Sequence, residues 1–260
     1  MAITNPTRQR LEKGELALGI GLRQARTVDI APAMATAGYD WLFIDLEHGT
    51  MSLDTAMQLS IAGHAAGISP LVRVPAGQYD MATRVLDGGA MGIVMPHVDT
   101  AEEARTMVER LKYPPIGKRS VAGALAQLAF ASRPLGEATA EINQSILLTA
   151  MLETPQAIAN ADAIAAVPGI DVLLIGTSDL TFEMGIPGQF MHVDVGKAYQ
   201  TAAAACRKHR KWLGMGGVYS DEGLAAYIAI GAKMVLAGSD FSLLMTAATT
   251  RAKALRGLTG

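Results

Sequence analysis

The chain has 260 residues, a formal net charge of −2, a hydrophobic fraction of 50% and a single cysteine, Cys206. This near-neutral balance excludes the strongly basic class of nucleic-acid-binding proteins and gives no attraction to an anionic membrane surface. One cysteine cannot build a disulfide framework, which fits a reducing compartment. The start of the chain, MAITNPTRQRLEKGE, lacks the apolar core of a signal peptide, and no apolar run reaches the roughly 18 residues of a membrane span. We therefore expect a cytoplasmic protein without nucleic-acid or membrane partners.

Short apolar runs that end in glycine or polar residues recur along the chain and predict buried strands. Runs such as LFIDL, LVRV and VLLIG are typical of parallel strands that are covered on both faces. The eight predicted strands are Leu16–Leu22, Trp41–Leu46, Pro70–Pro75, Met91–Pro96, Ile146–Leu152, Asp171–Gly176, Trp212–Gly217 and Lys233–Gly238.

Segments with helical periodicity separate these strands, and several begin with a residue suited to an N-cap. Eight strand–helix repeats without a dividing linker predict one (β/α)8 barrel domain over residues 1–260. A doubly wound open sheet is the alternative. Its GxGxxG phosphate loop is missing here, since the first strand ends in GIGLRQAR. The expected N-caps are Ser52, Thr100, Thr154 and Ser220.

Three segments stand apart from the simple repeat. The long connection 113–143 predicts an additional short helix or a functional loop. The basic cluster 207–211 follows an alanine-rich segment and predicts a solvated helix C-terminus, where cations are favoured. Residues 239–258 predict a final helix.

In a (β/α)8 barrel, catalytic residues lie at the carboxyl ends of the strands and in the loops that follow. Polar residues at the predicted strand ends should therefore converge on one rim, rich in carboxylates and typical of an enzyme active site. These residues are Asp45, Glu47, His48, Arg73, His97, Asp99, Glu153, Thr177, Ser178, Asp179, Ser239 and Asp240.

Two of the carboxylates are candidate metal ligands. Asp179 and Asp240 each precede a helical segment and so have the alternative role of an N-cap. Glu153 has no such local role, because Thr154 and Pro155 already supply the cap and the first-turn proline. Paired carboxylates without cysteine suit a hard cation such as Mg²⁺ or Mn²⁺, with water and substrate as further ligands. We predict that Glu153 and Asp179 bind a divalent metal ion.

Arg73 and His48 are the candidate groups for substrate binding and proton transfer. Arg73 interrupts the apolar run LVRV, and a charge buried there needs a carboxylate partner or an anionic substrate. His48 follows Asp45 and Glu47. A carboxylate beside an imidazole prepares it as a general base, whereas hydrogen bonding within the loop is the alternative.

These residues stand in motifs that resemble the HpcH/HpaI aldolase family, the metal-dependent class II pyruvate aldolases. The motifs run in order through almost the whole chain: GYDWLFIDLEHG, PLVRVP, GAMGIVMPHVDTAEEA, RLKYPPIGKRS, MLETPQAIANADAIAAVPGIDVLLIGTSDL and GAKMVLAGSD. The resemblance implies a phosphoenolpyruvate/pyruvate-type barrel that reversibly cleaves a 4-hydroxy-2-oxo acid to pyruvate, or a related 2-oxo acid, and an aldehyde. It also implies a Mg²⁺, Mn²⁺ or Co²⁺ cofactor and a homohexamer, a trimer of dimers whose last helix is exchanged between subunits.

The same resemblance implies roles for individual residues. Glu153 and Asp179 correspond to the metal ligands, and Arg73 to the arginine that contacts the oxo group and steadies the enolate. His48, supported by Asp45, corresponds to the acid–base pair. The backbone amides around Ser178 and Asp179 correspond to a cradle for the pyruvate carboxylate, at a helix N-terminus. The substrate-binding set that the resemblance implies is Arg73, Ser178, Asp179, Thr177 and Glu47.

Three positions are predicted to influence specificity. Met151 stands two residues before the metal-binding glutamate, where the family frequently has glutamine, and His97 occupies a position that is often apolar. Leu22, at the end of the first predicted strand, is the third. The acceptor aldehyde stays open among products of aromatic degradation, deoxy sugar acids and simple hydroxy-oxo acids.

Other functions compete with this one. A CoA-thioester lyase of the citrate or malyl-CoA type would need basic residues for the nucleotide, and the one basic cluster is 207–211. An oxaloacetate decarboxylase would use the same enolate. A Schiff-base aldolase would need a lysine at a strand end, where Lys118 and Lys233 are poorly placed. A non-catalytic binding protein would have lost the central residues, which are all present.

Overall fold

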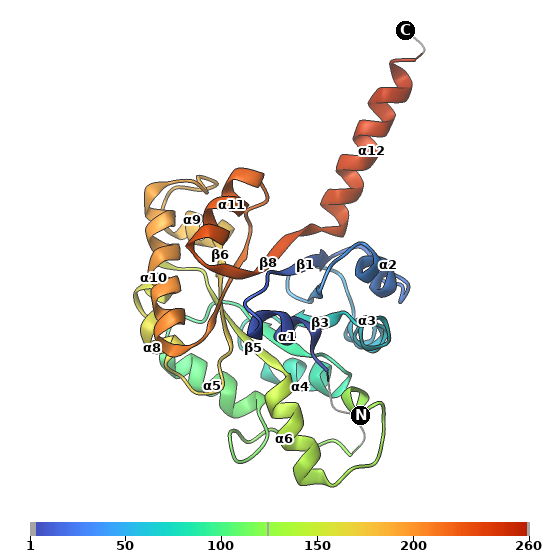
Figure 1. The fold of residues 1–260 in the computed structure, drawn as a ribbon, viewed down its shortest axis with the longest axis vertical. Coiled ribbons are helices and arrows are strands. Elements are labelled where there is room, and N and C mark those ends of the chain that lie inside the picture. The colour runs from blue at the N-terminus through green and yellow to red at the C-terminus, as the bar shows by residue number, and fades with distance from the viewer. Residues whose placement is uncertain (1–3, 124, 259–260) are drawn as a thin grey trace.

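The computed structural model describes residues 4–123 and 125–258, and in them eight parallel strands close into a barrel (Figure 1). Each strand is hydrogen-bonded to the next one in the chain, and β8 closes the barrel against β1. The expected (β/α)8 barrel is confirmed. The strands are β1 Ala17–Leu22, β2 Trp41–Asp45, β3 Ser69–Arg73, β4 Gly92–Met95, β5 Leu147–Leu152, β6 Val172–Gly176, β7 Trp212–Gly216 and β8 Ala232–Ser239.

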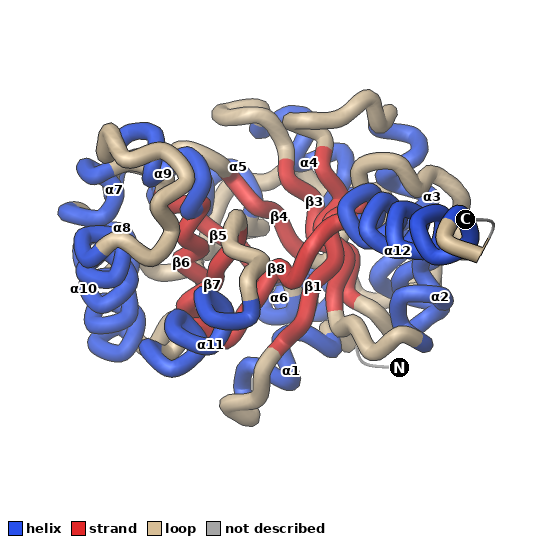
Figure 2. The backbone as a smooth tube through the Cα atoms, turned by 90° about the horizontal axis from the view of Figure 1, so that it is seen from above, coloured by secondary structure: helices blue, strands red, loops and turns tan. Residues whose placement is uncertain are grey.

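Helices surround the strands, as Figure 2 shows from above. The four predicted N-caps are confirmed, since each of their hydroxyl groups accepts a hydrogen bond from the amide three residues later. No helix in 4–123 and 125–258 has the length and apolar character to cross a membrane. The helices are α1 Pro6–Glu12, α2 Ile30–Thr36, α3 Leu53–Ala66, α4 Tyr79–Asp87, α5 Ala101–Leu111, α6 Leu135–Ser145, α7 Pro155–Ala159, α8 Ala161–Ala165, α9 Thr177–Glu183, α10 Val193–His209, α11 Asp221–Ile230 and α12 Asp240–Arg256.

The interior of the barrel is packed with side chains and is not a channel. Trp41 and Phe43 of β2 lie there with apolar residues of the other strands. Gly19 makes room for the indole ring, because a Cβ atom at that position would lie 2.1 Å from Cε2 of Trp41. Helix α1 covers the amino-terminal end, where Leu11 joins the interior core and Asn5 donates hydrogen bonds to the carbonyl groups of Met91 and Ser145. The carboxyl-terminal end is left for a site.

The segments that depart from the repeat fold largely as expected. The connection 113–143 contains a 3-10 turn, Ala126–Leu128, and the beginning of α6. The basic cluster lies at the C-terminus of α10, where Lys208 and His209 both contact Asp162. Because α10 precedes β7, this cluster lies at the amino-terminal end of the barrel. Cys206 is buried, and burial raises its thiol pKa to about 12, so it is chemically inert.

Helix α12 differs from the helices that follow the other strands. It extends away from the barrel (Figure 1), and none of its residues is buried. Apolar side chains remain exposed along it, among them Phe241, Leu244 and Met245. The capping residue is Ser239, which accepts from the amide of Ser242 and forms a capping box with it.

Candidate active site

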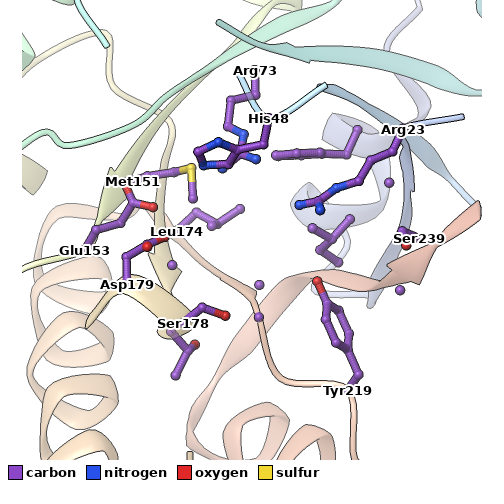
Figure 3. A pocket seen from close by; sticks show the side chains of 18 of the residues that line it. Arg23, His48, Arg73, Met151, Glu153, Leu174, Ser178, Asp179, Tyr219 and Ser239 are labelled. Carbon is purple, nitrogen blue, oxygen red and sulfur yellow. The ribbon is translucent and has the colours of Figure 1, made fainter. Parts of the chain in front are cut away.

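The carboxyl-terminal end of the barrel contains a cavity of about 410 Å³ (Figure 3). Its walls come from the ends of β1, β2, β3, β5, β6, β7 and β8. His48, Arg73, Glu153 and Asp179, which are far apart in the sequence, all line this cavity. The residues at the strand ends therefore meet at one rim, as the barrel rule requires.

Arg73 is buried in the wall of the cavity and is bound by two carboxylates. Its Nε and Nη2 atoms donate to Asp45 Oδ1 and Oδ2 at 3.0 and 2.6 Å, and Nη1 lies 3.1 Å from Glu47 Oε2. Burial alone raises the pKa of Asp45, but hydrogen bonds and charge from Arg73 outweigh it and hold that pKa below its usual value. Burial likewise opposes the charge of Arg73, and its carboxylate partners raise the pKa above the usual value. The pair is therefore charged and fixed.

Asp45 contacts the backbone amide of His48 and not its imidazole ring. Asp45 Oδ1 accepts hydrogen bonds from the amides of Glu47 and His48 at 3.1 and 3.2 Å. The ring of His48 is half exposed, and its Nε2 lies 3.6 Å from Glu47 Oε2. Asp45 ends β2 facing Arg73, so it shapes the turn, while Glu47 is the carboxylate beside the imidazole.

Glu153 is almost fully buried at the end of β5. Its Oε2 accepts a hydrogen bond of 2.9 Å from the amide of His97 and lies 3.5 Å from Nδ1 of the same residue. His97 adopts a left-handed backbone conformation with φ of 52°, which directs its amide at the carboxylate. Burial raises the pKa of Glu153 to about 7, and the amide and ring of His97 offset part of the effect while the charge of Asp179 adds to it.

Asp179 lies in the first turn of α9 and faces Glu153 across one corner of the cavity (Figure 3). It makes no side-chain cap of α9, so the alternative role as an N-cap is not the one observed. Between the two acids, Gly176 leaves the room that Glu153 occupies, since a Cβ atom there would lie 2.6 Å from Glu153 Oε1. That oxygen accepts no hydrogen bond from the described residues.

The donor set fits a hard divalent cation. No group of three or more His, Cys, Asp or Glu side chains within 4–123 and 125–258 is arranged to hold a metal ion. The cavity instead offers the carboxylates of Glu153 and Asp179. Mg²⁺ and Mn²⁺ are commonly held by one or two carboxylates, with water and substrate oxygens completing the shell, whereas structural zinc needs four protein ligands.

Ser178 and Thr177 contribute differently to the same wall. The Thr177 hydroxyl lies 2.7 Å from the hydroxyl of the fully buried Tyr199, so it points into the protein. Ser178 is exposed, and Gly217 keeps the space before it open, since a Cβ atom there would lie 2.9 Å from the amide nitrogen of Ser178. Thr177 therefore has only main-chain atoms available to a ligand in the cavity, whereas Ser178 has both its amide and its hydroxyl group.

The three positions expected to influence specificity have different surroundings. Met151 lines the cavity beside Glu153. His97 supports Glu153 from behind and does not line the cavity. Leu22 is wrong as a cavity residue: it is fully buried in the core beneath the helices. Side chains alternate along a strand, and Gly21 takes the inward position, so Leu22 faces outward.

Two acids at the predicted rim hold loops instead of lining the cavity. Asp99 Oδ1 accepts a hydrogen bond from the hydroxyl of Thr154 at 2.7 Å. Asp240 accepts hydrogen bonds from the amides of Arg23, Gln24 and Ala25, at 2.7 to 3.2 Å, and so fixes the loop after β1.

Sequence reasoning missed Arg23 and Tyr219, which both line the cavity. Arg23 directly follows β1, and Tyr219 stands three residues after the end of β7. Both residues follow the carboxyl end of a strand, which is where catalytic residues of a (β/α)8 barrel lie, so the sequence does contain a signal for them.

Comparisons with known proteins agree with this geometry. The profile of the HpcH/HpaI aldolase/citrate lyase family matches residues 23–247. A crystal structure of an HpcH/HpaI aldolase from Desulfitobacterium hafniense superposes with a TM-score of 0.91 at 30% identity, over 96% of each chain.

Two curated relatives are similar over nearly their whole length. The 4-hydroxy-4-methyl-2-oxoglutarate aldolase of Hapsidospora irregularis is 38% identical over 265 residues, covering 99% of this chain and 97% of that protein. The 2-keto-3-deoxy-L-rhamnonate aldolase of Escherichia coli K12 is 36% identical over 251 residues, covering 96% of this chain and 92% of that protein. The protein therefore belongs to the HpcH/HpaI aldolase/citrate lyase family, and it is a lyase.

Proposed function

We propose that this enzyme reversibly cleaves 4-hydroxy-2-oxo acids to pyruvate, or a related 2-oxo acid, and a carbonyl compound, with a divalent cation held by Glu153 and Asp179. One observation carries the proposal. Two carboxylates, Glu153 and Asp179, face the same cavity as a buried arginine, Arg73, which is already neutralised by Asp45 and Glu47, and their one ion pair in the described part of the chain joins Glu153 to the half-exposed ring of His97 at 3.5 Å. An additional cation is what balances the charge of this cavity.

Aldol cleavage requires that the negative charge of the enolate be stabilised and that the proton of the 4-hydroxyl group be removed. In cleavage, the bond between C3 and C4 breaks, its electron pair becomes the enolate of the 2-oxo acid, and the 4-hydroxyl group loses its proton as the new carbonyl forms. A divalent cation would supply Lewis-acid stabilisation of the enolate. Arg73 places a fixed positive charge in the same cavity, and removing one such donor typically lowers rates by about 10²–10³.

His48 is the group that we assign to the proton. Its imidazole lines the cavity, and its Nε2 lies 3.6 Å from Glu47 Oε2, a carboxylate placed to orient the ring for proton transfer. The ring would accept the hydroxyl proton during cleavage, and C3 of the enolate would then gain a proton, from this imidazolium or from water, to release the 2-oxo acid. In addition the ring would return its proton to the new hydroxyl group. The carboxylate of the 2-oxo acid would bind at the amides of Ser178 and Asp179.

The relatives suggest the range of acceptors. The Hapsidospora relative is named for 4-hydroxy-4-methyl-2-oxoglutarate and the Escherichia relative for 2-keto-3-deoxy-L-rhamnonate, and both compounds are 2-oxo acids with a 4-hydroxyl group. A CoA-thioester lyase is less well supported, because the basic cluster 207–211 precedes β7 and lies away from the cavity. We place the enzyme in the cytoplasm, in keeping with its single buried thiol at Cys206.

We also propose a homohexamer in which α12 is exchanged between subunits. The exposed apolar side chains of α12 support this assembly, because a helix with no buried residue gains little from the fold of its own chain. A neighbouring subunit would cover that helix.

The direct test is pyruvate release from a panel of 4-hydroxy-2-oxo acids by the purified enzyme. EDTA should abolish release, and Mg²⁺, Mn²⁺ or Co²⁺ should restore it and rank the metals. Asp179→Asn should lower kcat/KM by at least about tenfold, because it removes a charged ligand. The matched control is Glu183→Gln, an exposed acid on the same helix, which should retain activity.

Two results would oppose the proposal. Release that persists after complete removal of metal would exclude the role of Glu153 and Asp179. A substrate-dependent covalent adduct trapped by borohydride would indicate a Schiff-base lysine instead.

A further inference from the structure

The cavity has a second half that the proposed chemistry does not use. Arg23 and Tyr219 approach it from the side opposite Glu153 and Asp179 (Figure 3). The cleaved bond belongs near the two acids and Arg73. The opposite half is therefore the place for the part of the substrate that leaves as the carbonyl product.

Arg23 is the cationic group of this second half, and it is weakly partnered. Its side chain is 49% exposed, and its one ion pair joins Nε to Asp45 Oδ2 at 3.7 Å. That carboxylate already receives two short hydrogen bonds from Arg73. No hydrogen bond from the Arg23 guanidinium to the described residues is observed, so its five N–H donors are open to a ligand.

The backbone of Arg23 is fixed although its side chain is only weakly held. Asp240 accepts hydrogen bonds from the amide of Arg23 and from the two amides that follow it. Three amides on one carboxylate hold the loop against the root of α12. A guanidinium carried on a fixed loop loses little conformational freedom when it binds, which favours a defined ligand over general electrostatic attraction.

The surroundings leave room for a charged group and offer a second donor. Gly21 and Gly238 line the cavity on the β1–β8 side without side chains. Tyr219 directs its hydroxyl into the same space (Figure 3), and this hydroxyl has no hydrogen-bond partner among the described residues. A planar fork beside a phenolic hydroxyl matches the two oxygens of a carboxylate.

We propose that Arg23, assisted by Tyr219, binds a carboxylate at the acceptor end of the substrate. The enzyme would then prefer 4-hydroxy-2-oxo acids that carry a second carboxylate, and release pyruvate together with an acidic carbonyl compound such as another 2-oxo acid. Polyhydroxy 2-oxo acids without a second carboxylate would lack the anion that Arg23 needs. This inference rests on the proposed aldol cleavage and assigns its substrate class.

The experiment compares two substrates that differ in the second carboxylate: 4-hydroxy-4-methyl-2-oxoglutarate and the monocarboxylate 4-hydroxy-2-oxopentanoate, in which a hydrogen atom replaces that carboxylate. Wild-type enzyme should show the higher kcat/KM with the dicarboxylate. Arg23→Gln should lower kcat/KM for the dicarboxylate by about 10- to 100-fold more than for the monocarboxylate, chiefly through KM, because a hydrogen-bonded charge is lost. Arg23→Lys should restore part of the difference.

The control is Arg26→Gln, in the same loop. Arg26 donates to the carbonyl and hydroxyl groups of Thr50 and does not line the cavity, so both substrates should be processed as by the wild type. Equal losses on both substrates with Arg23→Gln would overturn the assignment, as would a wild-type preference for the monocarboxylate.

A further measurement separates this inference from the proposed function. Deuterium exchange into the methyl group of pyruvate needs the metal and the enolate but no acceptor. Metal-dependent exchange in an enzyme that ignores the second carboxylate would refute only the role of Arg23. Absence of exchange, and of pyruvate release from either substrate, would refute the aldol chemistry itself.

Discussion

At the scale of single residues, the position of Glu153 depends on a missing side chain. A Cβ atom on Gly176 would lie 2.6 Å from Oε1 and 2.7 Å from Cγ of Glu153. The carboxylate cannot retreat freely, because its other oxygen is bound by the amide of His97. Gly176 has φ of −83°, which alanine tolerates, so the clash is the dominant effect. We expect Gly176→Ala to weaken Mn²⁺ binding by at least about tenfold, as measured by titration calorimetry.

The control for this prediction is Gly196→Ala in α10, where an added Cβ atom meets nothing within 4 Å. This variant should bind Mn²⁺ like the wild type. It should also unfold with a free energy about 0.5–1 kcal/mol higher, because alanine is the better helix former. Equal Mn²⁺ affinity of the two variants would mean that Glu153 is not a ligand, or that it adapts without cost.

Lys112 gives a second prediction at this scale, remote from the cavity. Its Nζ is buried and donates to the carbonyl groups of Asn143 and Ile146 at 2.6 and 3.1 Å. Burial lowers its pKa to about 8, from 10.5 when solvated, although Asp171 opposes the shift. Between these pH values the unfolded chain holds a proton that the folded chain has released. Stability should therefore rise with pH across this window, by on the order of 3 kcal/mol in all.

Above about pH 9, Cys206 changes the stability in the opposite direction. Burial raises the pKa of its thiol to about 12, so the folded chain keeps a proton that the unfolded chain loses, and stability falls as the pH rises. The measurement is therefore the difference in unfolding free energy between wild type and Lys112→Met at several pH values. This difference should shift in favour of the wild type from pH 7.5 to pH 9. A difference that stays constant would show that folding does not lower the pKa of Lys112.

The sequence predicted the polar residues of the cavity better than their contacts. His48, Arg73, Glu153 and Asp179 could be selected because polar residues at barrel strand ends converge, whatever the details of packing. Which partner each finds depends on side-chain direction at the strand end, which the sequence does not specify. Asp45 therefore shapes a turn and binds Arg73, where the resemblance implied support of His48.

At the scale of elements, the predicted strands agree with the observed ones to within one or two residues, because apolar runs bounded by glycine mark buried strands directly. Helix starts were equally readable where Ser or Thr supplies the cap. The division of one helical segment into the short helices α7 and α8 is harder to predict. The two helices meet at Asn160, where the sequence has no proline or glycine to mark a break.

The link between α12 and the loop after β1 could not be read from the sequence. Asp240 and Arg23 are 217 positions apart, and the closure of the barrel by β8 on β1 brings them together. Its position before a helix allows Asp240 to be the cap, but Ser239 caps α12, and the oxygens of Asp240 accept hydrogen bonds from amides of the neighbouring loop. The first residue of α12, a helix that extends away from the barrel, thus fixes the loop after β1 that forms part of the cavity wall.

At the scale of the whole molecule, α12 is the helix that buries none of its residues against its own chain. Its apolar side chains Phe241, Leu244 and Met245 recur with the i, i+3, i+4 spacing of one helix face, and each is about half exposed or more. A contiguous exposed apolar face is typical of a protein–protein contact. We therefore predict that the wild-type enzyme is oligomeric at micromolar concentration.

Light scattering coupled to size exclusion tests this prediction. Wild type should elute with six times the mass of the chain, and Leu244→Glu combined with Phe241→Glu should shift it to smaller species, because charges would be buried in the contact. Thr250→Glu, on the other face of α12, should leave the mass unchanged. Because Asp240 at the root of α12 holds the loop of Arg23, the double variant should also lose activity when diluted. A monomeric wild type would refute the exchanged helix, and an intact hexamer in the double variant would place the contact elsewhere.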